Sequence, residues 1–171
     1  MGMILTGQDI LDRKLVLDAI DSRVQAQMCG FDLTVAKVER FINSGTIDFD
    51  NSRRLLPYME EVPLTTTRGS LEFWELPRGA YLVTYNETVQ IPSDCAAIAR
   101  PRSTLLRSGA TMETALWDPG YAGKSQSMLV VHANMLRLFK NARVAQLVFV
   151  ELGKSAETLY SGVYQGEGVV R

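Results

Sequence analysis

The sequence is short of the residues from which many hydrolytic sites are built. It has one histidine, His132, and two cysteines, Cys29 and Cys95, among 171 residues. A zinc-dependent deaminase needs a His or Cys ligand beside a catalytic Glu and a later Pro-Cys-x-x-Cys pair, and a cysteine nucleophile needs a histidine partner. His132 follows a run of strand-forming residues, which favours a structural or surface role over metal binding. Hydrolysis by this chain would therefore depend on carboxylates, hydroxyls, arginines and a metal carried by phosphate.

Charge excess and long apolar runs are also missing. The 18 Lys and Arg residues balance 19 Asp and Glu residues, for a net charge of −1. Duplex nucleic acid requires a basic footprint, so we expect no nucleic-acid partner, although a local pocket could still bind a small anion. No run approaches the ~18 apolar residues of a membrane helix, and no signal peptide is evident. Together with two widely spaced cysteines, these absences predict a protein of the reducing cytoplasm that has no membrane partner.

What is present predicts an all-β domain. Thr6-Gly7-Gln8-Asp9 is typical of a helix N-cap, and Ile10, Leu11, Leu15 and Leu17 would give a short amphipathic helix or helix-turn after it. From Gly30 onward, short strand-forming runs are separated by turn-forming residues. The predicted strands are 31–35, 80–85, 96–99, 128–131, 136–139 and 144–150, and the predicted turns are 77–79, 91–94, 118–120 and 140–141. Many short strands at this spacing favour a sandwich or closed barrel, and the length favours one domain over residues 1–171.

Four segments contain residues suited to phosphate chemistry. Residues 101–104 (Pro-Arg-Ser-Thr) can begin a short helix whose N–H groups and hydroxyls hold phosphate, and Arg102 can fork onto a carboxylate or a phosphate. Asp118 lies at the lip of a Pro-Gly turn and could face a cleft, although turn formation alone also explains it. Gln146 lies in an apolar strand, so its amide needs either a structural partner or a ligand. The four segments are 30–33, 100–105, 116–124 and 143–147.

The order and spacing of these segments resemble the dUTP diphosphatase and dCTP deaminase superfamily over nearly the full chain. Residues 30–33, 101–103, 118–123 and 143–147 are similar to its first four motifs, and residues 162–166 resemble the C-terminal motif of the deaminase branch. The stretches 4–10 and 76–92 are also deaminase-like. The resemblance implies a distorted β-barrel of jelly-roll type, assembled as a homotrimer with sites at subunit interfaces. Residues from about 160 to 171 would be a lid over the ligand, whereas their composition alone favours a frayed tail over such a lid without deciding between them.

The two activities of this superfamily depend on different carboxylates. In the deaminases, a Glu ten residues after the third-motif Asp activates the attacking water. That position is Met128 here, a thioether cannot exchange protons, and residues 124–128 contain no acid. Asp118, the diphosphatase carboxylate, is present. The sequence therefore favours a dUTP diphosphatase, with a dCTP deaminase (alone or bifunctional) and a non-catalytic nucleotide-binding trimer as alternatives; Glu113 is either a solvated acid or a displaced deaminase Glu.

The resemblance also implies a role for individual residues. Asp118 would deprotonate a water that attacks the α-phosphorus of dUTP, releasing dUMP and diphosphate, with Mg²⁺ carried mainly by the substrate phosphates. Arg102 would hold Asp118 or the phosphates, and Asp32 would reach the metal through water. Tyr121 would stack on the deoxyribose, and backbone groups of 111–116 would read uracil. The implied substrate-binding residues are Ser103, Thr104, Thr114, Leu116, Tyr121, Gln146, Tyr160, Tyr164 and Gln165.

The C-terminal segment departs from the resemblance at two positions. Val163 replaces a phosphate-contacting Lys of the deaminases, and Glu167 replaces a Gln. The segment also lacks the Arg and the Gly-Phe-Gly-Ser run of the stand-alone diphosphatases. How it closes over a nucleotide is therefore left open by the sequence.

Overall fold

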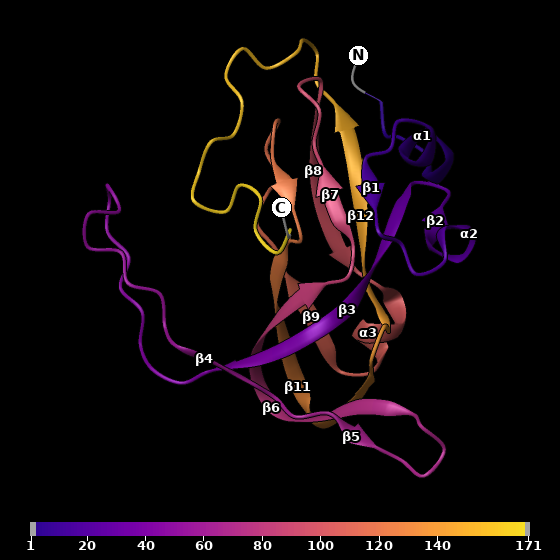
Figure 1. The fold of residues 1–171 in the computed structure, drawn as a ribbon, viewed down its shortest axis with the longest axis vertical. Coiled ribbons are helices and arrows are strands. Elements are labelled where there is room, and N and C mark those ends of the chain that lie inside the picture. Colours follow the sequence, from indigo (N-terminus) through magenta and orange to yellow (C-terminus); the bar gives the residue numbers. More distant parts are fainter. Residues whose placement is uncertain (1–2, 170–171) are drawn as a thin grey trace.

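The computed structural model describes residues 3–169 and confirms the all-β fold (Figure 1). Short helices lie beside a framework of antiparallel strands. None of the helices within residues 3–169 is long and apolar enough to span a membrane. The elements in order are α1 (Gly7–Asp12), β1 (Val16–Leu17), α2 (Ser22–Gln25), β2 (Ala26–Gln27), β3 (Gly30–Phe41), β4 (Met59–Glu61), β5 (Thr65–Thr66), β6 (Glu72–Tyr85), β7 (Thr88–Gln90), β8 (Cys95–Pro101), α3 (Ser103–Arg107), β9 (Ala110–Glu113), β10 (Ala122–Gly123), β11 (Gln126–Phe139) and β12 (Arg143–Glu151).

The larger of two sheets nearly closes into the predicted barrel. Its strands follow the order β8-β12-β3-β6-β11-β9, with β2, β4 and β5 paired at its margins. Just after β9, Trp117 forms a bridge with Ala97 of β8, so the two ends of the sheet approach each other. The smaller sheet has the order β1-β7-β10. This arrangement brings the turn after Trp117 to the rim of the barrel, because the bridge ties it to β8.

The barrel interior is filled with side chains that alternate along the strands. On β11, Leu129 and Val131 are buried while His132 is exposed, which is the period-two pattern of a strand with one face toward a core. Leu33 of β3 and Leu147 of β12 are likewise fully buried and belong to the same apolar cluster. The placement of His132 on the surface agrees with the sequence interpretation.

Several predicted boundaries are wrong in instructive ways. Helix α1 has the predicted capping box at Thr6 but ends at Asp12, so Leu15 and Leu17 lie outside it; Lys14, with φ of 54°, turns the chain out of the helix. Residues 77–79 are not a turn but part of β6, and 128–131 and 136–139 are one strand, β11, with an irregularity between Val131 and Met135. Pro77 pairs with Met135 at this irregularity, where a missing N–H disturbs the ladder least.

Two segments extend from the barrel and approach the same region. Residues 42–58, between β3 and β4, project from it as a long arm (Figure 1) and expose large apolar side chains such as Ile47, Phe49 and Tyr58. Residues 152–169 leave β12 and return toward β10. The second segment is the predicted lid, of which residues 170 and 171 lie outside the described residues.

Candidate active site

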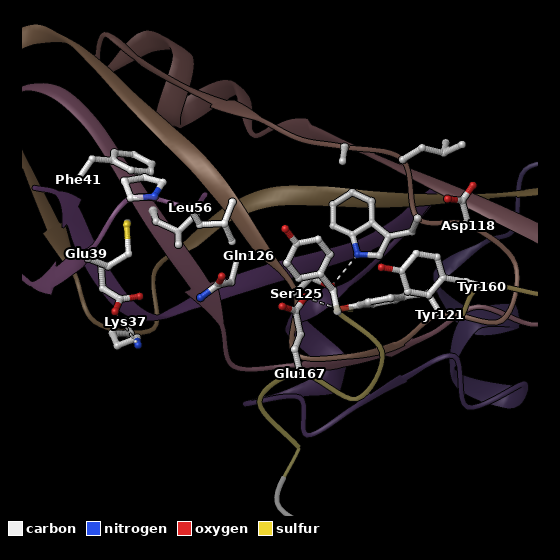
Figure 2. Close-up of a pocket in the computed structure, with 17 residues that line it drawn as sticks. Lys37, Glu39, Phe41, Leu56, Asp118, Tyr121, Ser125, Gln126, Tyr160 and Glu167 are labelled. Atoms are coloured by element: carbon white, nitrogen blue, oxygen red, sulfur yellow. Dashed lines mark hydrogen bonds and ion pairs between the residues drawn. The ribbon is translucent and has the colours of Figure 1, made fainter. Parts of the chain in front are cut away.

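The larger cavity encloses about 480 Å³ at the rim of the barrel (Figure 2). Strands β3, β6 and β11 form its floor, and the turn after Trp117, the C-terminal segment and the base of the arm form its walls. Lys37 and Glu39, which pair at 2.9 Å, lie at one end, and Asp118 lies at the other. The lining residues are Lys37, Glu39, Phe41, Leu56, Pro57, Met59, Leu82, Ala115, Leu116, Trp117, Asp118, Tyr121, Ser125, Gln126, Tyr160, Tyr164 and Glu167.

The backbone around Asp118 is fixed while its carboxylate is exposed. Trp117 exchanges two hydrogen bonds with Ala97, at 2.9 and 3.0 Å, and the N–H of Gly120 donates to Ile91 at 2.8 Å. Gly120 has φ of 90°, and a Cβ there would lie 2.6 Å from the Cβ of Leu159, so both conformation and packing favour glycine. The turn therefore holds an accessible carboxylate at a defined point of the cavity mouth.

A chain of hydrogen bonds runs behind Asp118. The indole Nε1 of Trp117 donates to Ser125 Oγ at 2.6 Å, and this hydroxyl donates to the Tyr121 hydroxyl at 3.2 Å. The Tyr121 hydroxyl in turn donates to Glu167 Oε1 at 2.8 Å. The ring of Tyr160 meets that of Tyr121 edge to face, with centroids 5.7 Å apart. Burial raises the pKa of both Tyr121 and Glu167, so the tyrosine remains a donor at neutral pH.

A second cavity, of about 390 Å³, carries the positive charge. Arg100 and Arg102 line it at the end of β8, together with Ser103 at the start of α3 and Gln146 of β12. Arg102 occupies the N-cap position of α3, so the first N–H groups of this helix lie next to its side chain. Gln146 Nε2 donates to the Cys29 carbonyl at 3.2 Å. Guanidinium groups, a hydroxyl and an amide together are suited to phosphate oxygens.

Asp32 lies beneath this second cavity and joins two arginines. Its side chain is 1% exposed, and Oδ2 lies 3.1 Å from both Arg102 Nε and Arg143 Nη1. Burial raises the pKa of Asp32, and the two guanidinium groups oppose that shift. The other oxygen, Oδ1, is buried and finds no hydrogen-bond partner within residues 3–169. Arg102 is therefore held by Asp32, and not by Asp118, which lines the other cavity.

The predicted site residues divide between the two cavities. Asp118, Leu116, Tyr121, Tyr160 and Tyr164 line the first, and Arg102, Ser103 and Gln146 line the second. Thr104 and Thr114 line neither of them.

Gln165, also predicted as a ligand contact, binds the turn that carries Asp118. It donates to the Gly120 carbonyl at 2.9 Å and accepts from the Ala122 N–H at 3.1 Å.

Sequence reasoning did not assign roles to Ser125, Arg143 or the Lys37–Glu39 pair. Of these residues, Arg143 carried a signal in the sequence, since it begins the segment 143–147. The others depend on contacts across the sheet. Glu113, the extra acid, is exposed and pairs in register with Met128. It is not among the residues that line either cavity.

Comparisons with known proteins agree with the geometry. Residues 4–152 match the dCTP deaminase-like family model. A Methanosarcina barkeri protein called "Probable deoxyuridine 5'-triphosphate nucleotidohydrolase" is 49% identical, over 90% of this chain and 88% of its own length. A protein of the same name from Archaeoglobus fulgidus is 44% identical over 97% of this chain and 98% of its own length.

A solved structure gives independent support for the fold. The 2'-deoxycytidine 5'-triphosphate deaminase from Agrobacterium tumefaciens superposes with a TM-score of 0.65 at 16% identity, over 88% of this chain and 48% of that one. Its barrel is thus shared with a chain about twice as long. With the matched family model and the two relatives, this establishes that the chain belongs to the dCTP deaminase-like family.

Proposed function

We propose that the protein is a dUTP diphosphatase that hydrolyses dUTP to dUMP and diphosphate. The observation that supports this most directly is the exposed carboxylate of Asp118 at the mouth of an aromatic cavity, combined with a methionine at position 128. A carboxylate so placed can take a proton from water, whereas Met128 cannot. The names of the relatives from Methanosarcina barkeri and Archaeoglobus fulgidus point to the same reaction.

In this proposal the first cavity holds the nucleoside. Tyr121 packs against the deoxyribose, and Leu116 and the backbone of residues 111–116 contact uracil. Tyr160 and Tyr164 close the cavity from the C-terminal side. The Tyr121 ring suits this role because its hydroxyl is bound from two directions, so the ring has one position and leaves a fixed space beside it. Thr104 and Thr114 are kept as weaker contacts.

The second cavity would hold the phosphates, through Arg102, Ser103 and Gln146. Arg102 lies five positions along the chain from Ala97, the bridge partner of Trp117, and five steps of extended backbone span roughly 16 Å. The carboxylate and the guanidinium are thus far apart within one chain. We therefore propose a homotrimer in which the nucleoside cavity of one copy meets the phosphate cavity of the next.

The chain's own residues fit a Mg²⁺ ion that arrives with the nucleotide. No group of three or more His, Cys, Asp or Glu side chains that could hold a metal occurs within residues 3–169. Mg²⁺ characteristically uses one or two carboxylates together with substrate phosphates. Asp32 has an unpartnered buried oxygen, Oδ1, that could accept from a metal-bound water. The ion would neutralise charge that develops on the phosphates, while Arg102 and Ser103 orient them.

Deamination of dCTP is the second candidate, and Glu113 is the residue on which it depends. Its register position opposite Met128 brings an acid near the place where the deaminase branch has its Glu. The side chain is exposed, however, and does not line the cavity. For that reason we favour the diphosphatase.

One assay separates these functions. Purified protein with Mg²⁺ is given dUTP or dCTP, and diphosphate and ammonia are measured in parallel. We expect diphosphate from dUTP and no ammonia from dCTP. Ammonia from dCTP would overturn the assignment in favour of a deaminase, and tight dUTP binding without product would favour a non-catalytic trimer.

We further propose that the protein is cytoplasmic and consists of one domain. Cys29 and Cys95 are both free, as is usual for proteins of the reducing cytoplasm. Residues 1–171 are proposed to form one domain with a lid from about residue 160, of which 1–2 and 170–171 lie outside the described residues.

A further inference from the structure

The C-terminal segment is bound along the turn that carries Asp118 and Tyr121. The N–H of Tyr160 donates to Pro119 at 2.8 Å, and the N–H of Gly166 donates to Ala122 at 2.8 Å. The N–H of Lys124 donates to the Glu167 carbonyl, also at 2.8 Å. These contacts join residues of one chain, and Tyr160, Tyr164 and Glu167 line the cavity, so the segment forms one of its walls.

Within residues 152–169, Glu167 is the acidic residue that lines the cavity. Figure 2 shows its side chain pointing toward the Tyr121–Ser125 pair, and its Oε1 accepts from the Tyr121 hydroxyl at 2.8 Å. Across the turn, a Cβ at Gly123 would lie 2.8 Å from the Tyr121 hydroxyl and 3.2 Å from the Glu167 N and O atoms. Gly123 thus lets Tyr121 and Glu167 approach this closely, and substitution there would separate them.

The position of the Tyr121 ring is consequently fixed by hydrogen bonds to its hydroxyl from two sides. Ser125, itself held by Trp117, approaches the hydroxyl from the barrel side, and Glu167 approaches it from the C-terminal side. A phenol that both donates and accepts has a preferred ring position, because rotation would break two hydrogen bonds at once.

We propose that Glu167 is a positioning residue that fixes the Tyr121 ring and, through it, the selectivity of the nucleoside cavity for a 2'-deoxyribose. This inference rests on the proposed function, since Tyr121 is the ring assigned to the sugar. Glu167 does not touch the reacting phosphorus in this arrangement. Its removal should therefore affect KM and the preference for dUTP over UTP, and leave kcat for dUTP nearly unchanged.

The experiment compares Glu167→Leu, Glu167→Gln and Tyr121→Phe in the full chain. A hydrogen bond to a charged acceptor corresponds to about a tenfold change in binding. We expect Glu167→Leu to raise KM for dUTP about tenfold and to reduce the preference over UTP. Glu167→Gln, whose carbonyl still accepts from Tyr121, should stay within about threefold of the wild type. Glu157→Leu is the matched control, because its side chain is 85% exposed in the same segment.

Two further measurements identify the contact and separate this inference from the proposed function. With Tyr121→Phe already present, Glu167→Leu should change KM little further, because Tyr121→Phe has already removed the hydrogen bond between the two side chains. Without nucleotide, hydrogen exchange at the Lys124 and Gly166 amides should become faster in Glu167→Leu and remain at the wild-type rate in Glu157→Leu.

The outcomes are distinguishable. Additive effects of the two substitutions, or wild-type exchange together with wild-type KM in Glu167→Leu, would overturn the positioning role. If the wild type does not hydrolyse dUTP, the proposed function fails, and the exchange measurement still shows whether Glu167 secures the turn.

Discussion

The two cavities use their aspartates in opposite ways. Asp32 is buried under the second cavity, and its Oδ2 holds Arg102 and Arg143. Asp118, at the mouth of the first, is exposed and forms no ion pair within residues 3–169. The Asp32 side chain is 1% exposed and its Oδ2 is bound to two guanidinium groups, whereas the Asp118 side chain is exposed to water. This difference in accessibility is consistent with the role of base that we propose for Asp118.

Removing the free carboxylate should have the largest effect. Asp118→Asn keeps the side-chain size and the turn but cannot accept a proton, so we expect kcat to fall by about a hundred- to ten-thousandfold, with dUTP binding largely kept. Steady-state kinetics and a nucleotide-binding titration measure the two quantities. Glu113→Gln is the control, and we expect it to be nearly as active as the wild type. If Glu113→Gln were slow and Asp118→Asn fully active, Glu113 and not Asp118 would be the acid on which the reaction depends.

The division of the site between copies can be tested by mixing two inactive variants. Asp118→Asn lacks the carboxylate of the first cavity, and Arg102→Gln lacks the guanidinium of the second. If a neighbouring copy completes each site, co-expression should restore about one intact site in four. The mixture should then be far more active than either variant alone. Activity no higher than the average of the two would mean that one chain supplies both groups.

Replacing the carboxylate of Asp32 should weaken the affinity for dUTP without lowering the stability of the fold. Asp32→Asn frees Arg102 and Arg143 from their shared partner, and we expect KM for dUTP to rise about tenfold because the guanidinium groups lose their orientation. Burial raises the pKa of Asp32, so its ionised form costs folding free energy. Urea unfolding should accordingly show Asp32→Asn to be as stable as the wild type, within about 1 kcal/mol. A large loss of stability with unchanged KM would make Asp32 a structural residue only.

The smallest expected effect concerns Glu87, a buried acid that lies in neither cavity. Its carboxylate accepts from the Thr34 N–H at 2.9 Å and from Gln25 Nε2 at 2.7 Å, and Gln25 also donates to the Asp32 carbonyl. Burial raises the pKa of Glu87 above its usual 4.5, despite the opposing effect of these hydrogen bonds. The folded state therefore binds the proton more tightly than the unfolded state does.

The sign of the pH dependence follows from this difference. The contribution of Glu87 to stability is fully present below pH 4.5 and is lost as the pH rises through the folded-state pKa. Glu87→Gln should make the decline of unfolding free energy above pH 4.5 less steep, without removing it, since the pKa of Asp32 and that of Glu167 are raised in the same direction. Urea unfolding at a series of pH values measures the slope. An unchanged slope would show that Glu87 does not titrate in this range.

Sequence reasoning located the strands better than their ends. The alternation in 31–35 and the apolar run in 144–150 identified β3 and β12, because both patterns are local properties of the chain, although residues 31–35 are buried on both faces. It missed the continuity of β6 through Pro77 and of β11 through its irregularity. Both depend on which strand lies alongside, and a turn-forming residue does not make a turn where cross-strand pairing continues.

The site was predicted unevenly for the same reason. Asp118, Tyr121 and Arg102 were found through the order of motifs, and each does line a cavity. The partner of Arg102 was expected to be Asp118 or phosphate, whereas the structure pairs it with Asp32. Gln165 was expected to contact ligand, and the structure adds contacts with Gly120 and Ala122 that the sequence did not indicate. Residue type predicted that these groups make polar contacts but not with which partner.

The amino-acid sequence alone determined the all-β class and the family resemblance, and it is the basis for proposing Asp118 as the catalytic carboxylate, since position 128 is a methionine. Those conclusions depend on residue identity, turn chemistry and short-range periodicity, which are properties of neighbouring residues. Only the tertiary structure decided that Asp118 and Arg102 line different cavities and that Glu167 reaches Tyr121, 46 residues away. Such pairings depend on how the barrel closes and on which groups then lie within hydrogen-bond distance of each other. A buried polar group needs a hydrogen-bond partner, and the packing of the chain determines which partner is near it.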